Sequence, residues 1–184
     1  SEDEEALEKE VLPDVLSILP LTNTVLFPGV VIPINAGSDK SIKLIKDANK
    51  SNKLIGVVAQ KSGKDENPSI DNIHGIGTVA KILRVLKMPD GNTTVIIQGK
   101  KRFKIKSVVK TDPYIQATVD SVNDKNQKKS NSKFSATIDA IKDIALKIIK
   151  ENPNIPSEAS FAIKNIHSSA FLINFVCSNM NITL

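Results

Sequence analysis

Three prolines divide the apolar stretch 18–34, and their positions limit the fold more than any other feature of the chain. Pro20, Pro28 and Pro33 interrupt two short apolar runs, and Gly29 follows the second proline. Because proline fixes φ and lacks a backbone N–H, it belongs at strand ends, sheet edges and turns. The stretch therefore predicts two strands that bend around a stiff apolar connection.

The connection itself, Leu26-Phe27-Pro28-Gly29, allows two interpretations. In the first, it is a corner that helps to close a small barrel. In the second, it is a partly exposed apolar ridge onto which another polypeptide docks. The two interpretations can both hold, and the exposure of Leu26, Phe27 and Pro28 in the folded chain distinguishes them.

The composition supports a packed core, and the sequence lacks the features of a membrane-spanning, secreted or disulfide-bonded protein. The chain has 184 residues, of which 40% are hydrophobic, and aromatic residues make up only 4%. No apolar run approaches the roughly 20 residues that a membrane-spanning helix needs. The N-terminus lacks the basic and apolar regions of a secretory signal. The single cysteine, Cys177, excludes an intrachain disulfide and favours a cytosolic setting.

Charge is distributed unevenly along the chain. Residues 1–17 carry seven acids and one base, a net charge of −6. Because the whole chain has a net charge of +5, residues 18–184 carry a net charge of +11. We expect the acidic leader, residues 1–14, to be disordered because it has little apolar content. The basic remainder makes nucleic acid or another anion a partner to consider.

Alternating apolar residues and turn signals predict a meander of strands with one early helix. Ser38 is a plausible N-cap for a helix that ends near Asn49. A bulge is expected near Gly77 or Lys81, and Gly99 is expected to interrupt a strand. The strands are expected at 15–21, 30–35, 54–60, 75–88, 93–98, 100–110 and 114–122. Such a meander usually closes into a small barrel, because closure removes vulnerable edges.

The spacing of apolar residues along the chain changes after a polar linker at 123–132. Apolar residues then recur at three- and four-residue steps, which predicts an amphipathic helix over 132–150. Two shorter helices are expected at 157–165 and 168–178, capped by Ser157 and Ser168. The fold class is therefore α+β, a small β-barrel followed by a helical part. Because the sequence stops soon after the third helix, we expect it to be part of a longer protein.

Motifs for catalysis are missing from the sequence. It contains neither a phosphate-binding Gly-x-x-x-x-Gly-Lys-Ser/Thr loop nor a Gly-x-Ser-x-Gly elbow. His74, His167 and Cys177 lack the close spacing of metal ligands, and Cys177 lies on an apolar helix. We therefore expect no catalytic residue and no metal site, so that the chain is not an enzyme by itself.

Two sets of residues remain as candidates for binding. The most basic segment, 100–110, could follow a phosphate backbone, although a solvated barrel face is the simpler interpretation, and Phe103 should point into the core. Its candidate anion-binding residues are Lys100, Lys101, Arg102, Lys104 and Lys106. The other set would bind polypeptide through the apolar ridge and one helix face, and it comprises Leu26, Phe27, Pro28, Asp39, Lys40 and Lys43.

An ordered series of segments resembles the N-terminal domain of the ATP-dependent protease Lon. The resemblance covers about residues 15 to 182, and the order of the segments is more specific than any one of them. They include Leu19-Pro20-Leu21, Phe27-Pro28-Gly29, Ile76-Gly77-Thr78-Val79-Ala80-Lys81-Ile82, Leu86-Lys87-Met88-Pro89-Asp90-Gly91, Ile96-Ile97-Gln98-Gly99-Lys100-Lys101-Arg102 and Asn154-Ile155-Pro156-Ser157-Glu158.

This resemblance implies a PUA-like β-domain over 15–122 and a helical subdomain over 133–184. It implies a role in protein quality control, in which the region recognises unfolded or degron-bearing polypeptides, passes them to a downstream AAA+ motor and serine protease, and supports a homohexameric ring. ATP and Mg would act downstream, with no cofactor here. The implied location is the bacterial cytoplasm, or the mitochondrial matrix in a eukaryote, with no membrane partner. The alternative is a PUA-like nucleic-acid-binding module that uses 100–110.

Overall fold

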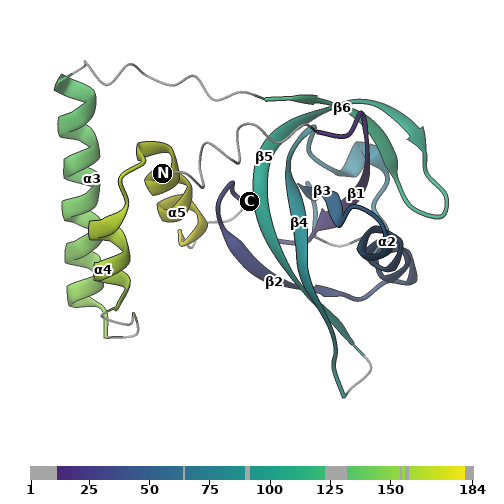
Figure 1. The fold of residues 1–184 in the computed structure, drawn as a ribbon, viewed down its shortest axis with the longest axis horizontal. Helices are drawn as coiled ribbons and strands as arrows, with labels where there is room; N and C mark the ends of the chain where they lie inside the picture. Colours follow the sequence, from purple (N-terminus) through teal and green to yellow (C-terminus); the bar gives the residue numbers. More distant parts are fainter. Residues whose placement is uncertain are drawn as a thin grey trace.

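The computed structural model describes residues 12–63, 65–89, 92–122, 132–153, 155 and 158–180. A curved six-stranded sheet with one helix forms one part of the molecule, and three helices lie beside it (Figure 1). The elements are β1 Val15–Leu21, β2 Val31–Ala36, α2 Asp39–Lys50, β3 Leu54–Ala59, the 3-10 helix η1 Ile70–Asn72, β4 Ile76–Lys87, β5 Thr93–Lys110, β6 Gln116–Ser121, α3 Ser132–Glu151, α4 Glu158–Asn165 and α5 Ser169–Ser178.

The sheet curls back on itself around β5. Its strand order is β2-β5-β4-β3-β1-β6, and β6 also pairs with β5. Only β1 and β3 pair in parallel; the other described pairs are antiparallel. Within the described strands β2 pairs with β5 alone, so the sheet is barrel-like rather than fully closed. The expected α+β fold with a barrel-like sheet and following helices is thus confirmed.

Helix α2 begins where the sequence predicts. The Ser38 hydroxyl accepts a hydrogen bond from the Ser41 backbone N–H at 3.2 Å, and Asp39 lies in the first turn. Such a cap satisfies one of the otherwise unpaired N–H groups at a helix start. The helix ends at Lys50, one residue later than expected, and it buries Leu44, Ile45 and Ala48 against the sheet.

Strand β5 does not break at Gly99, so the expected interruption is wrong. The Gly99 N–H donates to the Val30 carbonyl at 2.9 Å, and the Gly99 carbonyl accepts from the Gly29 N–H at 2.9 Å. A Cβ at Gly99 would lie 2.2 Å from the Phe27 carbonyl oxygen. Glycine therefore lets the segment before β2 pass close to β5 while the strand continues to Lys110.

The irregularity expected in β4 is present, although its position differs. The register with β5 shifts between Thr78 and Ala80 and again between Ile82 and Arg84, not at Gly77 or Lys81. Apart from β5, the expected strands are found with bounds that differ by no more than two residues. The strand types follow from local alternation, whereas the bulge positions depend on the pairing with β5.

The described residues form three apolar clusters. One lies between α2 and the sheet and includes Leu26, Ile45 and Ile97. A second is centred on Phe103 and includes Ile18 and Val58, which lie on the other face of β1 and β3. The third joins α3, α4 and α5 around Ile163, Ile166 and Leu172. None of the three clusters contains residues from both the sheet and the helices α3–α5.

The three C-terminal helices agree with the predicted change of period. The Ser168 hydroxyl accepts from the Phe171 N–H at 3.1 Å, so the expected cap of α5 is confirmed. Ser157, the leader up to residue 11 and the linker at 123–131 lie outside the described residues. The proposed domain boundaries and the disorder of the leader remain predictions. Among the described helices, none combines the length and apolar character needed to cross a membrane.

Candidate functional site

The first candidate, the Leu26-Phe27-Pro28 ridge, is only partly at the surface. Leu26 is 4% exposed and belongs to the cluster beneath α2. Its carbonyl accepts a hydrogen bond of 2.7 Å from the buried Thr78 hydroxyl on β4. The expectation that Leu26 is a surface contact is therefore wrong, because its side chain lies in the core cluster. Phe27 and Pro28 are half-buried.

Helix α5 contacts the same loop from the other side. The Asn174 side-chain amide donates to the Pro28 carbonyl at 3.4 Å. Gly29 adopts a φ of +80°, and a Cβ there would lie 2.7 Å from two ring carbons of Phe171. Figure 1 shows α5 between the sheet and the other two helices. The loop is therefore an internal corner on which the helical part rests, more than a free ridge.

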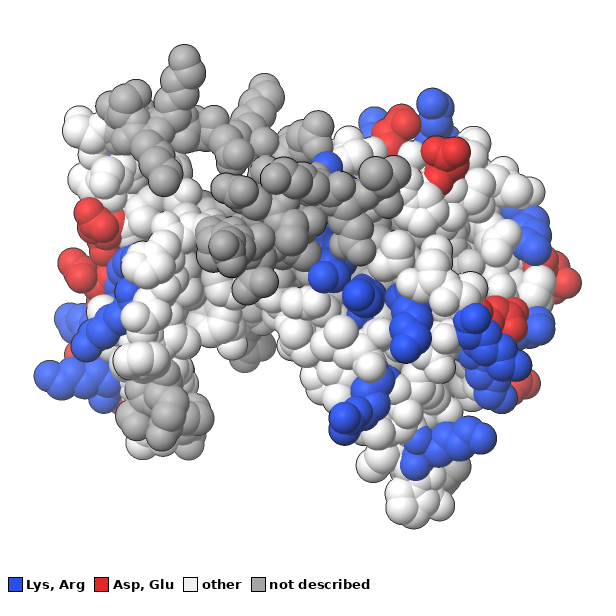
Figure 2. Space-filling model, viewed as in Figure 1, with Lys and Arg blue, Asp and Glu red and all other residues white. Residues whose placement is uncertain are grey.

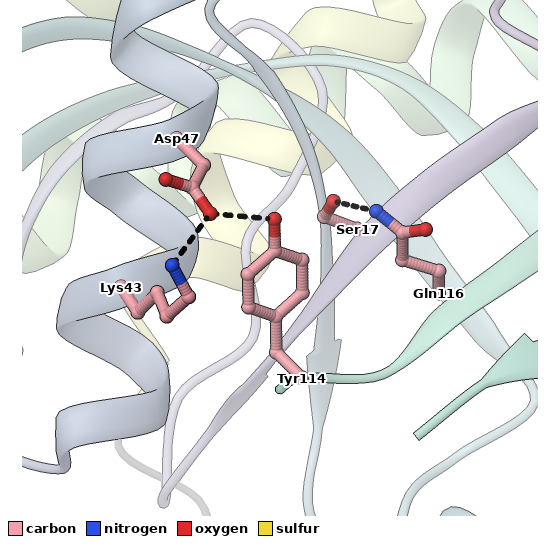
Figure 3. Close-up of polar contacts among 5 residues, drawn as sticks. All are labelled: Ser17, Lys43, Asp47, Tyr114 and Gln116. Carbon is pink, nitrogen blue, oxygen red and sulfur yellow. Dashed lines mark hydrogen bonds and ion pairs between the residues drawn. The ribbon is translucent and has the colours of Figure 1, made fainter. Parts of the chain in front are cut away.

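The predicted polar face of α2 is exposed, as a binding role would require. Asp39, Lys40 and Lys43 all reach solvent. The Lys43 ammonium lies 3.5 Å from an Asp47 carboxylate oxygen, and the Tyr114 hydroxyl donates to the same oxygen at 3.0 Å (Figure 3). Lys43 therefore has an intramolecular partner, whereas Lys40 makes no ion pair with any described residue.

Tyr114 connects α2 to the segment before β6. Burial raises the pKa of the Tyr114 hydroxyl above its ordinary value of 10.0, and the hydrogen bond to Asp47 and the charge of that carboxylate raise it further. Beside it, the Gln116 side-chain amide donates to the Ser17 hydroxyl at 3.2 Å (Figure 3). These contacts fix one flank of a pocket.

The pocket has a volume of about 380 Å³ and lies between α2, the end of β1, the loop 66–70 and the segment 111–115. Its floor is apolar, with Ile18, Leu19, Leu44 and Ile115, and Lys40 and Glu66 stand at its rim. Of the predicted site residues only Lys40 lines it. The rim therefore carries one charge of each sign.

The predicted anion-binding strand is partly neutralised and offers no aromatic platform. Phe103 is 0% exposed, which confirms that it points into the core. The Lys106 ammonium lies 3.7 Å from an Asp120 carboxylate oxygen, and Lys104 pairs with Asp120 across the β5–β6 ladder. Single-stranded nucleic acid is usually held by base stacking on aromatic rings. This arrangement does not favour the nucleic-acid alternative.

Sequence reasoning missed a different surface, on the outward side of three neighbouring strands. Cross-strand partners in a sheet share a face. Two rows cross the strands in the order β2, β5, β4: Val31, Gln98 and Lys81, then Pro33, Ile96 and Arg84. A third row holds Asn35, Thr94 and Leu86, and the Thr94 hydroxyl donates to the Asn35 side chain at 2.9 Å. Together with Leu83, these residues are called the β2–β5–β4 face.

Apolar side chains stand open to solvent on this face. Val31 is 49%, Leu83 47% and Leu86 37% exposed. The register shift between Ile82 and Arg84 leaves both Leu83 and Arg84 exposed, whereas Val85 packs against the core. Strict alternation along β4 would not have placed Leu83 and Leu86 on the same surface. The expected bulge was the only signal that could have revealed it.

The same three strands carry positive charge alone. The sequences of β2, β4 and β5 contain no Asp or Glu, and β4 and β5 together contain nine Lys and Arg residues. Figure 2 shows blue side chains and white surface over these strands, with red at the margins. An exposed apolar surface with basic charge can bind another polypeptide.

The side chains most able to bind a metal or to act as nucleophiles are spread along the sequence and, among the described residues, do not form a metal site. His74 and His167 are exposed, and Cys177 is half-buried on α5. Within the described ranges, no group of three His, Cys, Asp or Glu side chains is placed to hold a metal ion.

Known proteins resemble this chain over its whole length. It is 63% identical over 183 residues to the Lon protease of Flavobacterium johnsoniae and 50% identical over 183 residues to that of Cytophaga hutchinsonii. In both comparisons the match covers 100% of this chain and 22% of the relative. The chain therefore spans about a fifth of the length of these relatives.

The fold also matches solved structures. The N-terminal domain of the Mycobacterium avium complex Lon protease superposes with a TM-score of 0.74 at 19% identity, covering 92% of this chain and 84% of that one. A Lon N-terminal domain protein from Xanthomonas campestris gives a TM-score of 0.57 at 14% identity, with coverages of 90% and 98%. The family described as the ATP-dependent protease La (LON) substrate-binding domain matches residues 15–184. The chain therefore belongs to the Lon substrate-binding domain family.

Proposed function

We propose that this chain captures non-native polypeptide for an ATP-dependent serine protease and passes it to a downstream motor. The relatives that cover the whole chain are Lon proteases, and the chain corresponds to about a fifth of their length. ATP and Mg would be used by the parts of the parent protein outside this chain. The proposal places the protein in the cytoplasm of a bacterium and in a ring of identical subunits.

The observation that carries this proposal is the exposed apolar surface of the β2–β5–β4 face. Val31, Leu83 and Leu86 are each more than a third exposed, and they lie on β2 and β4, the two strands that flank the first half of β5. Unfolded chains differ from folded ones in offering apolar side chains from an extended backbone. A shallow surface binds such segments weakly, which allows a processive motor to draw them away.

Two of the sequence-predicted regions are retained as additional contacts in this proposal. Phe27 and Pro28 are half-buried beside α5, and Asp39, Lys40 and Lys43 form an exposed polar face on α2. Leu26 is excluded because it is buried. Support of ring assembly is a separate part of the proposal, and comparing the ring size of the parent protein with and without residues 1–184 tests it.

The test measures the binding of a permanently unfolded, fluorescently labelled protein to this chain by anisotropy. Replacing Leu83 and Leu86 with Ser removes the apolar part of the face. Each leucine would bury roughly half of its side chain on binding, about 1 kcal/mol, or about fivefold in affinity. The two losses together amount to about 2 kcal/mol, so we expect the double variant to bind about 25-fold more weakly.

A matched control is available on the helical part. Ile144 and Ile148 on α3 are 60% and 54% exposed, so Ile144→Ser with Ile148→Ser makes a similar change elsewhere. The control should bind as the unaltered chain does. Equal losses in both double variants would contradict the assignment to the β2–β5–β4 face, and no binding by the unaltered chain would contradict the proposal itself.

A further inference from the structure

We infer that the β2–β5–β4 face selects apolar segments that carry acidic residues. The inference rests on the proposed function, because it specifies which polypeptides the same face would prefer. It starts from the two cations within the face. Lys81 lies in the row with Val31, and Arg84 lies in the row with Pro33 and Ile96.

The spacing puts charge and apolar surface within reach of a single ligand segment. Neighbouring strands are about 4.8 Å apart. Arg84 is therefore one strand away from Ile96, and Lys81 is two strands away from Val31. A segment that lays an apolar side chain on Val31 or Ile96 would bring its own neighbouring residues next to these cations.

These two cations are available to a ligand. Both are exposed, and neither takes part in a hydrogen bond or ion pair with any residue of the described ranges. By contrast, Lys43 is close to Asp47 and Lys106 to Asp120. Since β2, β4 and β5 contain no acid, the strands that form the face supply no competing carboxylate.

The ligand would lie across the face rather than extend the sheet. The Gly99 N–H bonds to the Val30 carbonyl, so the backbone carbonyl of residue 30 faces β5. Because this direction alternates from residue to residue along an antiparallel strand, the backbone groups of residue 33 face the free edge of the sheet. Residue 33 is proline, which has no N–H to offer there. Recognition through side chains, and thus through charge, is favoured over the sequence-independent addition of a strand.

Polypeptide fits this surface better than nucleic acid does. The face combines its cations with aliphatic side chains, Val31, Leu83, Leu86 and Ile96, and it contains no aromatic ring on which a base could stack. Acidic side chains flanking an apolar core would pair with the cations while that core covers the aliphatic surface.

The experiment uses three peptides that share one apolar core and differ only in their flanks, which carry two Glu, two Gln or two Lys residues. Binding to the chain is measured by anisotropy in low salt. Exposed ion pairs add little each, so we expect the Glu peptide to bind about 3- to 10-fold more tightly than the Gln peptide, and the Lys peptide to bind most weakly. About 1 M salt should reduce these differences to less than twofold.

Charge reversal on the face provides the decisive comparison. Lys81→Glu with Arg84→Glu should invert the order of the Glu and Lys peptides. Lys46→Glu with Lys147→Glu makes the same change in net charge at exposed positions of α2 and α3, and it should preserve the order. Circular dichroism checks that each variant is folded.

The outcomes separate this inference from the function on which it rests. Equal binding of all three peptides overturns the charge selectivity and leaves the proposed function standing. An order that survives the reversal of Lys81 and Arg84 also overturns it. Failure of every peptide to bind overturns both. Tighter binding of a single-stranded oligouridylate than of the Glu peptide would identify the face as a nucleic-acid surface instead.

Discussion

Tyr114 is the only tyrosine of the chain, and its hydroxyl bonds to Asp47 at the flank of α2. Burial, followed by the contact with Asp47, raises its pKa above 10.0. The folded state therefore retains a proton that the unfolded state has already lost at high pH. The resulting stabilisation is fully present below about pH 10 and is lost as the pH rises through the folded pKa.

Because the chain has one tyrosine and no tryptophan, absorbance at 295 nm follows the ionisation of Tyr114 alone. We expect its titration midpoint to lie above 10 in the native protein and to return to about 10 in concentrated urea. Asp47→Asn should lower the native midpoint, because it removes the negative charge and the charged acceptor. Identical midpoints with and without urea would contradict the contact between Tyr114 and Asp47.

Single residues also show where sequence reasoning reaches its limit. The prolines and the Ser38 cap act locally, and they were placed correctly. The side chain of Leu26 is buried in a cluster with residues as distant as Ile97, and its carbonyl bonds to Thr78, which is 52 positions further along the chain. The role of Gly99 depends on its approach to Phe27, a contact between separate segments. Neither property is encoded in the few residues around the position itself.

Among the elements, α5 and the loop before β2 form the least expected contact. The hydrogen bond from Asn174 to Pro28 joins residues 146 positions apart. Gly29 is required there for two reasons, a positive φ and the proximity of the Phe171 ring. A left-handed conformation costs a non-glycine residue roughly 1–2 kcal/mol, and overpacking adds about 1–3 kcal/mol.

A double-mutant cycle separates these two costs. Gly29→Ala should destabilise the chain more in the unaltered background than in Phe171→Ala, where only the backbone strain remains. We expect a coupling energy on the order of 1 kcal/mol, measured by urea unfolding followed at 222 nm. Gly37→Ala is the matched control, because nothing lies within 4 Å of its Cβ position. Zero coupling would show that α5 does not rest on this loop.

Strand types could be predicted because alternation is local, but the registers could not. The β2–β5–β4 face exists only because β5 aligns β2 on one side and a bulged β4 on the other. A one-residue slip would move each apolar side chain to the opposite side. The sequence alone therefore suggested a polypeptide-binding role through a family resemblance, while the surface that supports it required the structure.

The molecule as a whole contains a sheet and a helical part with separate apolar clusters. Both clusters of the sheet are complete by Val119, and the third cluster begins at Ile138. The contacts between the parts include the Asn174 hydrogen bond and the Phe171 packing. Each part therefore has the core that independent folding requires.

We predict that a chain ending at Val122 folds cooperatively without the helices. Its thermal midpoint should fall by less than about 10 °C, because the loss of the α5 contacts amounts to one or two kcal/mol. Thermal unfolding followed by circular dichroism near 218 nm measures this midpoint. A broad, non-cooperative melt would show that the helical part is needed to complete the sheet.

The pairing of β1 with β6 has a consequence for folding during synthesis on the ribosome. Val15 pairs with Thr118, whereas the parallel partner of β1 is β3, which begins at Leu54. During synthesis β1 can therefore gain one neighbour early, but its other edge stays open until more than a hundred residues have left the ribosome. Open strand edges invite pairing with other chains. A domain proposed to bind misfolded polypeptides is thus itself prone to misfolding and aggregation while it is being synthesised.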